Sequence, residues 1–174
     1  MTATVEIDQY NGAGPTACDI TSASLKAGTS DELSASNTPV PTSGSNYTYW
    51  ATTGLYCTAA ADNALNNIKW YSDGTNSLGT GLMAVVTQAS AYVQADGTAG
   101  SSGSVLSLAN HSGACAAPVN FTTYTSGTKM SVSGSTDTTV GSFGNFLVVQ
   151  VQVETTASAG NSGEETFTWQ YDES

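Results

Sequence analysis

The feature that most constrains the fold is an alternation of apolar and polar residues near the C-terminal end of the chain. Leu147, Val149, Val151 and Val153 alternate with Val148, Gln150, Gln152 and Glu154. Successive side chains of a strand point to opposite faces, so this spacing predicts a half-buried strand over 145–154. Phe167, Trp169 and Tyr171 alternate in the same way after a loop over 155–163. The two predicted strands form either a long hairpin or a crossover between two sheets.

Shorter strands are predicted upstream, separated by turn residues. A turn is expected over 10–15, and a brief helical turn over 59–67, where Asp62 is a candidate cap. No repeat of fixed period is visible. The predicted upstream strands cover 5–8, 20–25, 47–57, 68–71, 81–93 (one bent strand or two), 105–108, 119–124 and 129–132.

The composition agrees with an all-β chain. Serine and threonine number 49 and glycine 18, a mixture that suits strands and turns better than helices. Leucine, isoleucine, valine and phenylalanine number only 29, but 15 aromatic residues and the patterned stretches favour a folded chain over a disordered one. We therefore predict one domain over 1–174, a β-sandwich of about nine strands, immunoglobulin-like or jelly-roll.

One segment, 27–45, departs from this pattern because Leu33 and Val40 are its only large apolar residues. Loops longer than about 12–15 residues are uncommon in compact domains and are often functional or disordered. Pro39 and Pro41 favour an extended backbone. We expect this segment to be an arm that lies across a neighbouring subunit, and its expected contacts are Leu33, Pro39, Val40 and Pro41. Such an arm would be ordered by assembly and mobile in the isolated protein. The alternative is an ordinary surface loop.

The charge of the chain limits its partners. The net charge is −11, there is no arginine, and the lysines are Lys26, Lys69 and Lys129. Such a chain cannot neutralise a row of phosphates, so we expect no nucleic-acid binding. The apolar runs are far shorter than the roughly 20 residues that span a bilayer, and no signal peptide follows Met1, so we expect neither membrane insertion nor export.

The cysteines and the single histidine offer little chemistry. The chain has three cysteines, Cys18, Cys57 and Cys115, so a single disulfide would leave one free thiol. The main alternative is three buried free thiols. A zinc site built from them and His111 lacks any Cys-x-x-Cys pair. His111 and Cys115 could form a base and a nucleophile, but the small turn residues around them favour a plain loop.

The carboxylates give no catalytic or metal pattern. Glu164 with Glu165, and Asp172 with Glu173, are sequence neighbours, so in strands their side chains point apart instead of facing each other across a cleft. The turn over 73–76 lacks the acid spacing of a calcium loop. We therefore predict no enzyme activity, no cofactor and no metal.

The aromatic residues cluster between 47 and 71. On an exposed sheet face, Tyr47, Tyr49 and Trp50 would stack on sugar rings, as in a carbohydrate-binding or adhesive module. Alternatively, a chain this poor in leucine and isoleucine packs its aromatic residues inside. The residues concerned are Tyr47, Tyr49, Trp50, Tyr56, Trp70 and Tyr71.

Taken in order, these segments resemble the small all-β structural proteins of tailed bacteriophages and related viruses that decorate or cement a capsid. The likeness rests on strings that span most of the chain. They are Val-Glu-Ile-Asp at 5–8 leading into Tyr-Asn-Gly at 10–12, the aromatic strand at 47–50, Asn-Ile-Lys-Trp-Tyr-Ser-Asp-Gly-Thr at 67–75, Tyr-Val-Gln-Ala-Asp-Gly-Thr-Ala-Gly at 92–100, and the strands at 147–153 and 166–173.

The resemblance implies a β-sandwich or jelly roll without catalytic residues. It also implies assembly in the host cytoplasm, residence in the virion, and binding to the major capsid protein or other virion proteins. Homo-oligomers, often trimers, are expected. Proteins of this kind act through large complementary surfaces formed by many copies, which needs no active site.

Overall fold

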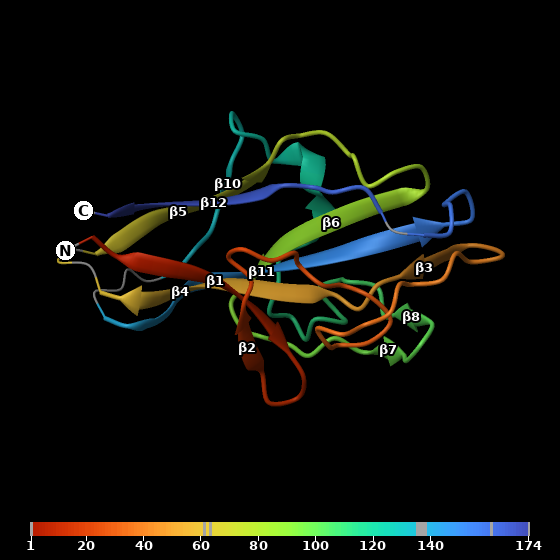
Figure 1. Cartoon of the computed structure of the whole chain (residues 1–174), viewed down its shortest axis with the longest axis horizontal. Coiled ribbons are helices and arrows are strands. Elements are labelled where there is room, and N and C mark those ends of the chain that lie inside the picture. The colour runs from red at the N-terminus through yellow and green to blue at the C-terminus, as the bar shows by residue number, and fades with distance from the viewer. Residues whose placement is uncertain (1, 61, 63, 135–138, 161, 174) are drawn as a thin grey trace.

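Antiparallel strands dominate the structure, as the composition predicts (Figure 1). The computed structural model describes residues 2–60, 62, 64–134, 139–160 and 162–173. Within these residues, no helix is long and apolar enough to cross a bilayer. The elements are β1 (Thr4–Asn11), β2 (Thr16–Asp19), β3 (Ser45–Tyr47), β4 (Ala51–Ala59), β5 (Leu65–Ser72), β6 (Leu82–Ala89), β7 (Gly97–Thr98), β8 (Ser102–Gly103), β9 (Val119–Asn120), a 3-10 turn η1 (Phe121–Thr123), β10 (Met130–Ser131), β11 (Gly141–Glu154) and β12 (Phe167–Glu173).

The larger sheet has the order β2-β1-β4-β11-β6-β9, and β3 also pairs with β11. The longest strand, β11, lies between β4 and β6, and its register with β6 runs unbroken from Phe146 opposite Ala89 to Val153 opposite Leu82. Its register with β4 shifts between Phe143 and Leu147. This irregularity separates two stretches of β11 that both pair with β4.

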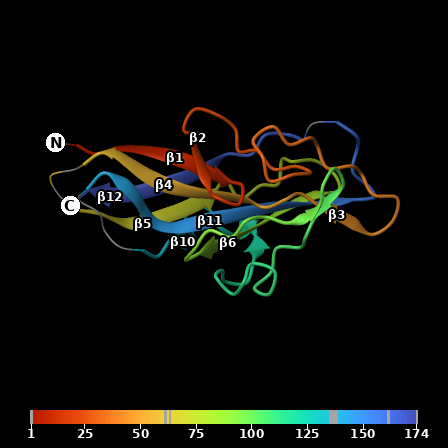
Figure 2. The same cartoon turned by 90° about the horizontal axis from the view of Figure 1, so that it is seen from below.

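A smaller sheet, β10-β5-β12, packs against one face of the larger one, giving a sandwich-like arrangement (Figures 1 and 2). The chain therefore crosses from one sheet to the other between β11 and β12, as one of the two predicted connections requires. The core between the sheets includes Leu55, Trp70, Phe121, Leu147 and Val149. The apolar face of β12, with Phe167, Trp169 and Tyr171, packs against this core, as the alternation predicts.

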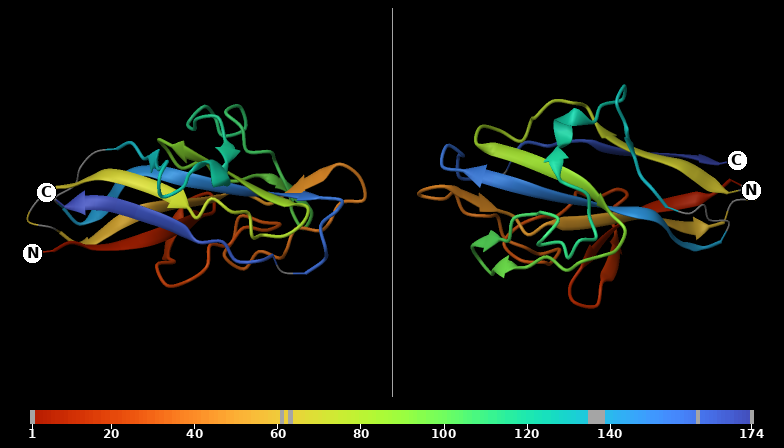
Figure 3. Two further views of the ribbon diagram at one scale, coloured as in Figure 1. Left: turned by 90° about the horizontal axis from the view of Figure 1, so that it is seen from above. Right: turned by 180° about the vertical axis from the view of Figure 1, so that it is seen from behind.

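The outer face of the larger sheet is buried at Val148 and Gln150, which contradicts the prediction that β11 is half-buried along its length. Val148 is fully buried and Gln150 is 1 % exposed. Segments distant in sequence cover them, because Tyr49, Trp50, Ala95, Leu106 and Cys115 form a second apolar cluster around Val148. The loops around β7 and β8 lie over this side of the sheet (Figure 3).

Two predicted strands are wrong. Residues 20–25 form no strand. The hairpin that turns after Asn11 pairs Thr16–Asp19 with β1, and the chain turns at Thr21 and Ser22 directly after this pairing ends. Residues 105–108 also form no strand. The main-chain N–H of Leu106 donates to the Gln150 side chain, and Asn110 donates to the oxygen of Val105, so these backbone groups are satisfied without a neighbouring strand.

Some of the other predicted segments are confirmed and others are wrong. The turn over 10–15 is confirmed, and 81–93 contains one strand, β6. The helical turn predicted over 59–67 is wrong for Leu65 to Asn67, which belong to β5, while residues 61 and 63 lie outside the described residues. Residues 121–123 form a 3-10 turn that follows β9.

Candidate functional site

The segment 27–45 lies against its own domain over its first part. Gln9 is fully buried, and its amide donates to the main-chain oxygen of Lys26 (2.6 Å) and accepts from the N–H of the same residue (2.9 Å). Thr29 is buried, and its oxygen accepts from Gly100. Asp31 accepts from the Asn11 amide, the Gly12 N–H and the Tyr92 hydroxyl. These bonds attach 26–31 to the β1–β2 hairpin and to the loop after β6.

The predicted arm contacts lie farther along this segment. Leu33 is 39 % exposed and Pro39 is exposed, whereas Val40 and Pro41 are half-buried. The segment contains no helix, and its last residue, Ser45, is the first residue of β3. Hydrogen bonds within the chain hold Thr29 and Asp31, so this part of the segment has contacts that do not depend on a neighbouring subunit. Mobility of the segment in the isolated protein stays a prediction. Contact of Leu33 and Pro39 with a neighbouring subunit stays a prediction.

The aromatic residues do not form a sugar-binding surface. Trp50 is 2 % exposed, its Nε1 donates to the Val93 oxygen (3.0 Å), and its ring lies 5.5 Å from the ring of His111. Tyr49 is also buried, and Tyr47 is half-buried in β3. The prediction of an exposed Tyr47, Tyr49 and Trp50 platform is therefore wrong, and the alternative that the aromatic residues pack inside is confirmed for Tyr49, Trp50 and Trp70.

His111 and Cys115 do not form a catalytic pair. His111 is fully buried, and neither ring nitrogen has a hydrogen-bond partner among the residues that the structure describes. The Cys115 sulfur faces the main-chain oxygen of Ser107. Burial lowers the pKa of His111 and raises that of Cys115, which disfavours both the imidazolium and the thiolate. All three cysteines are free thiols; Cys57 and Cys115 are buried and Cys18 is half-buried.

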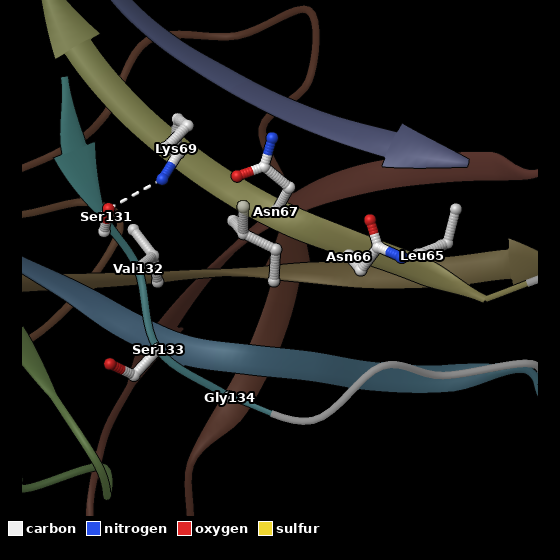
Figure 4. Close-up of a pocket in the computed structure, with 9 residues that line it drawn as sticks. Leu65, Asn66, Asn67, Lys69, Ser131, Val132, Ser133 and Gly134 are labelled. Carbon is white, nitrogen blue, oxygen red and sulfur yellow. Dashed lines mark hydrogen bonds between the residues drawn. The ribbon is translucent and has the colours of Figure 1, made fainter. Parts of the chain in front are cut away.

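A shallow hollow lies between β5 and residues 131–134, with a volume of about 120 Å³ (Figure 4). Lys69 lies at its rim and donates through Nζ to Ser131 Oγ (2.6 Å). A second hollow, near Gln88 and Met130, measures about 50 Å³. Both are well below the roughly 300–1,000 Å³ of ligand pockets. These two hollows therefore do not fit a small-molecule substrate.

Exposed edges of the sheets are the more extensive surface features. On one side, β12 pairs with β5 from Phe167 opposite Ser72 to Glu173 opposite Leu65. In the described part of the chain, no strand pairs with its other side. The opposite edge, β10, is only two residues long. Edge strands expose unpaired N–H and C=O groups that can pair with another chain, so β12 is a candidate interface.

Several large apolar side chains are exposed outside the sheets. Val105 is 45 % exposed, Leu108 54 % and Val140 55 %. Val105 and Leu108 belong to one loop. Leu106 of this loop packs on the outer face of the larger sheet, while the side chains of Val105 and Leu108 are exposed. Single exposed apolar residues are normal, but two on one loop enlarge the contact surface available to a partner.

The carboxylates that the sequence singled out have structural roles. Asp73 accepts from the N–H of Thr75 within a turn. Glu165 accepts from Ser77, Asp172 from Asn67, and Glu173 from the N–H of Ala3. These bonds hold loops and strand ends together.

A different carboxylate cluster has metal-ligand geometry. One oxygen from each of Glu6, Asp8 and Asp19 lies within 4.8 Å of the others. Sequence analysis missed this group because it placed residues 20–25, instead of Thr16–Asp19, in the strand. The signal was present, since a hairpin turning at 12–15 sets Asp19 opposite Asp8.

No family model, curated protein or solved structure matches the chain.

Proposed function

We propose that this chain is a non-enzymatic structural protein of a virion, a capsid decoration subunit that binds the shell and copies of itself. Its fold would be a single β-sandwich of the immunoglobulin-like or jelly-roll kind. In the larger sheet β11 lies between β4 and β6, and both of these strands are far from β11 in sequence. This order supports such a topology over a simple meander. Its assembly would take place in the host cytoplasm, and its partner would be the major capsid protein or another virion protein.

The observation that carries the proposal is the unpaired edge of β12. This strand is seven residues long and its inner face is held by the core, so its outer backbone groups are presented on a rigid element. Addition of a strand to such an edge forms main-chain hydrogen bonds along its whole length. A subunit that joins copies of itself or a shell protein needs such a surface and needs no reaction centre.

The acidic residues of β12 would restrict which chains can pair with its edge. Asp172 and Glu173 lie at the end of the strand and are exposed, and charged residues at an edge restrict pairing to a complementary partner. The net charge of −11 makes copies repel one another at low salt, so self-association should strengthen as salt screens that repulsion. A partner rich in lysine and arginine would show the opposite dependence on salt.

Sedimentation of the purified chain at about 0.02 M and about 0.2 M salt tests the edge. Phe167 and Trp169 face the core, so the side chain of Thr168 between them lies on the outer face of β12, and Thr168→Lys places a charge on this edge strand. Lysine on an edge strand opposes strand addition, so the variant should self-associate at least about tenfold more weakly. Thr155→Lys, in the exposed turn after β11, makes the same charge change and should associate like the parent.

Equal association of Thr168→Lys, Thr155→Lys and the parent would show that the β12 edge is not the interface between copies. A chain that stays monomeric at both salt concentrations would contradict self-association itself. Addition of purified shells to the same three proteins separates shell binding from contacts between copies, because shell-bound protein sediments with the particles.

A further inference from the structure

Three carboxylates converge on the outer face of the larger sheet, at the β1–β2 hairpin. Glu6 and Asp8 are two residues apart on β1 and so point to the same side. Asp19 lies directly opposite Asp8 across the pair of strands. The ligand atoms of all three lie within 4.8 Å of one another. In Figure 1 the hairpin is the pair of red strands β1 and β2, with β2 at the free edge of the sheet.

Asp8 is the unusual member of this group. It is 6 % exposed, yet its carboxylate accepts no hydrogen bond from the part of the chain that the structure describes. Asp19, in contrast, is exposed, and hydrogen bonds from the Thr21 side chain and from the Thr21 N–H (2.8 Å) lower its pKa. A largely buried carboxylate that has no donor from the protein favours a counter-charge or a proton beside it.

Among the described residues, the charge that acts on Asp8 is that of another carboxylate. Burial and, second, the negative charge of Asp19 raise the pKa of Asp8. Lys69 and Lys129 donate to Ser131 and Gln170 on the smaller sheet. Tyr10 also lies near Asp8, and its hydroxyl is directed to Ser142 (3.1 Å). Like charges opposite each other on neighbouring strands destabilise a hairpin, so the free cluster opposes the β1–β2 pairing.

We propose that Glu6, Asp8 and Asp19 bind a divalent cation, Ca²⁺, at this hairpin. All the donor atoms are carboxylate oxygens, the ligands that hard cations prefer, and no sulfur or nitrogen ligand is among them. Calcium accepts carboxylates in one- or two-oxygen modes and irregular geometry, whereas Mg²⁺ requires a near-ideal octahedron. Asp19 is exposed, so water completes the coordination.

Binding would join β2 to β1 at the point where the chain leaves the sheet. Asp19 is the last residue of β2, and the next residue, Ile20, donates to the oxygen of Ile7 on β1. A cation held by both strands replaces repulsion with attraction at this junction. The cation would therefore order the hairpin and, through Asn11 and Gly12, the segment fixed by Asp31.

Calorimetric titration of the chain with CaCl₂ at pH 7.5 tests the site, with thermal unfolding in Ca²⁺ and in EDTA as the second readout. The parent should bind one Ca²⁺ per chain with a Kd of about 10⁻⁴ to 10⁻³ M, the range of open extracellular sites, and Mg²⁺ should bind more weakly. The melting temperature should rise with Ca²⁺ as linkage requires.

Two variants separate this site from diffuse attraction of cations to an acidic protein. Asp8→Asn removes a ligand and should lose at least about tenfold in affinity, while melting at a higher temperature than the parent in EDTA because the repulsion is gone. Glu154→Gln makes the same charge change at an exposed residue at the end of β11, and should keep the Ca²⁺ response. If Asp8→Asn does not fold, Glu6→Gln takes its place in the titration.

The proposal is overturned if the parent shows no saturable binding of Ca²⁺, or if the parent and the ligand variant respond equally. A higher melting temperature of Asp8→Asn in EDTA without Ca²⁺ binding to the parent would also overturn it, because it would show that a shared proton relieves the cluster.

Discussion

Replacement of Gln150 by alanine tests the burial of the outer face of the larger sheet. The Gln150 side chain is 1 % exposed and makes three hydrogen bonds to main-chain groups of distant loops. Its Oε1 accepts from Leu106 N–H (2.6 Å), and its Nε2 donates to the oxygens of Thr48 and Ser104 (2.7 Å each). Alanine at 150 leaves all three groups without their partner.

The magnitude follows from those three groups. Each buried group left unsatisfied costs about 1–3 kcal/mol, so the loss should reach at least about 2 kcal/mol even if water enters the cavity and satisfies one of the three. Gln152→Ala is the matched control, because Gln152 lies on the same face of the same strand. It is half-buried, and it donates to the Ser45 hydroxyl at the end of β3. Its loss should cost about 1 kcal/mol or less.

Urea unfolding followed by tryptophan fluorescence gives both free energies, and an unchanged m-value shows that the comparison is valid. Losses of equal size at 150 and 152 would refute the burial of this face, and would restore the half-buried strand that the alternation alone predicts. A large loss at 150 alone would confirm that the loops around 48 and 104–106 are part of the folded core.

Three other predictions concern the histidine, the loop and the C-terminal strand. Burial lowers the pKa of His111 in the folded chain, whereas in the unfolded chain the pKa is the ordinary value of about 6.5, so the free energy of unfolding should fall as the pH drops from 7.5 to 5.5. In urea titrations, His111→Leu should lose less stability than the parent over this range. An identical loss would contradict the buried neutral ring. Deletion of residues 28–36 removes Thr29 and Asp31, so it should lower the melting temperature clearly, and an unchanged value would show that their bonds contribute nothing. Trp169→Ala should cost about 2–3 kcal/mol, at or below the usual range for a core tryptophan because the side chain is only half-buried, and a cost under about 0.5 kcal/mol in chemical denaturation would place it outside the core.

Local pattern was sufficient for much of the fold. Alternation over 147–153 and 167–171 placed both strands and their inner faces correctly, because side-chain direction in a strand depends only on position. The turn over 10–15 followed from its asparagine, glycines and proline. These features are set by neighbours in sequence, which a single chain displays directly.

What covers the outer face could not be predicted in this way. Val148 and Gln150 are buried by Trp50, Leu106 and Cys115, which approach from loops 30 to 100 residues away. Nothing in the alternation distinguishes Gln150 from Gln152, since the difference is whether a loop crosses above each side chain. The Glu6, Asp8 and Asp19 cluster was missed for a related reason, because it needs the register of a hairpin and not only its turn.

Mass spectrometry of purified virus particles, from cells that produce this chain, tests the proposed role most directly. A decoration subunit should be present in a fixed ratio to the major capsid protein and remain with intact particles through a density gradient. Loss of Thr168→Lys, but not of Thr155→Lys, from those particles would tie retention to the β12 edge. Absence of the chain from particles, or a copy number that varies with the preparation, would contradict the proposed function.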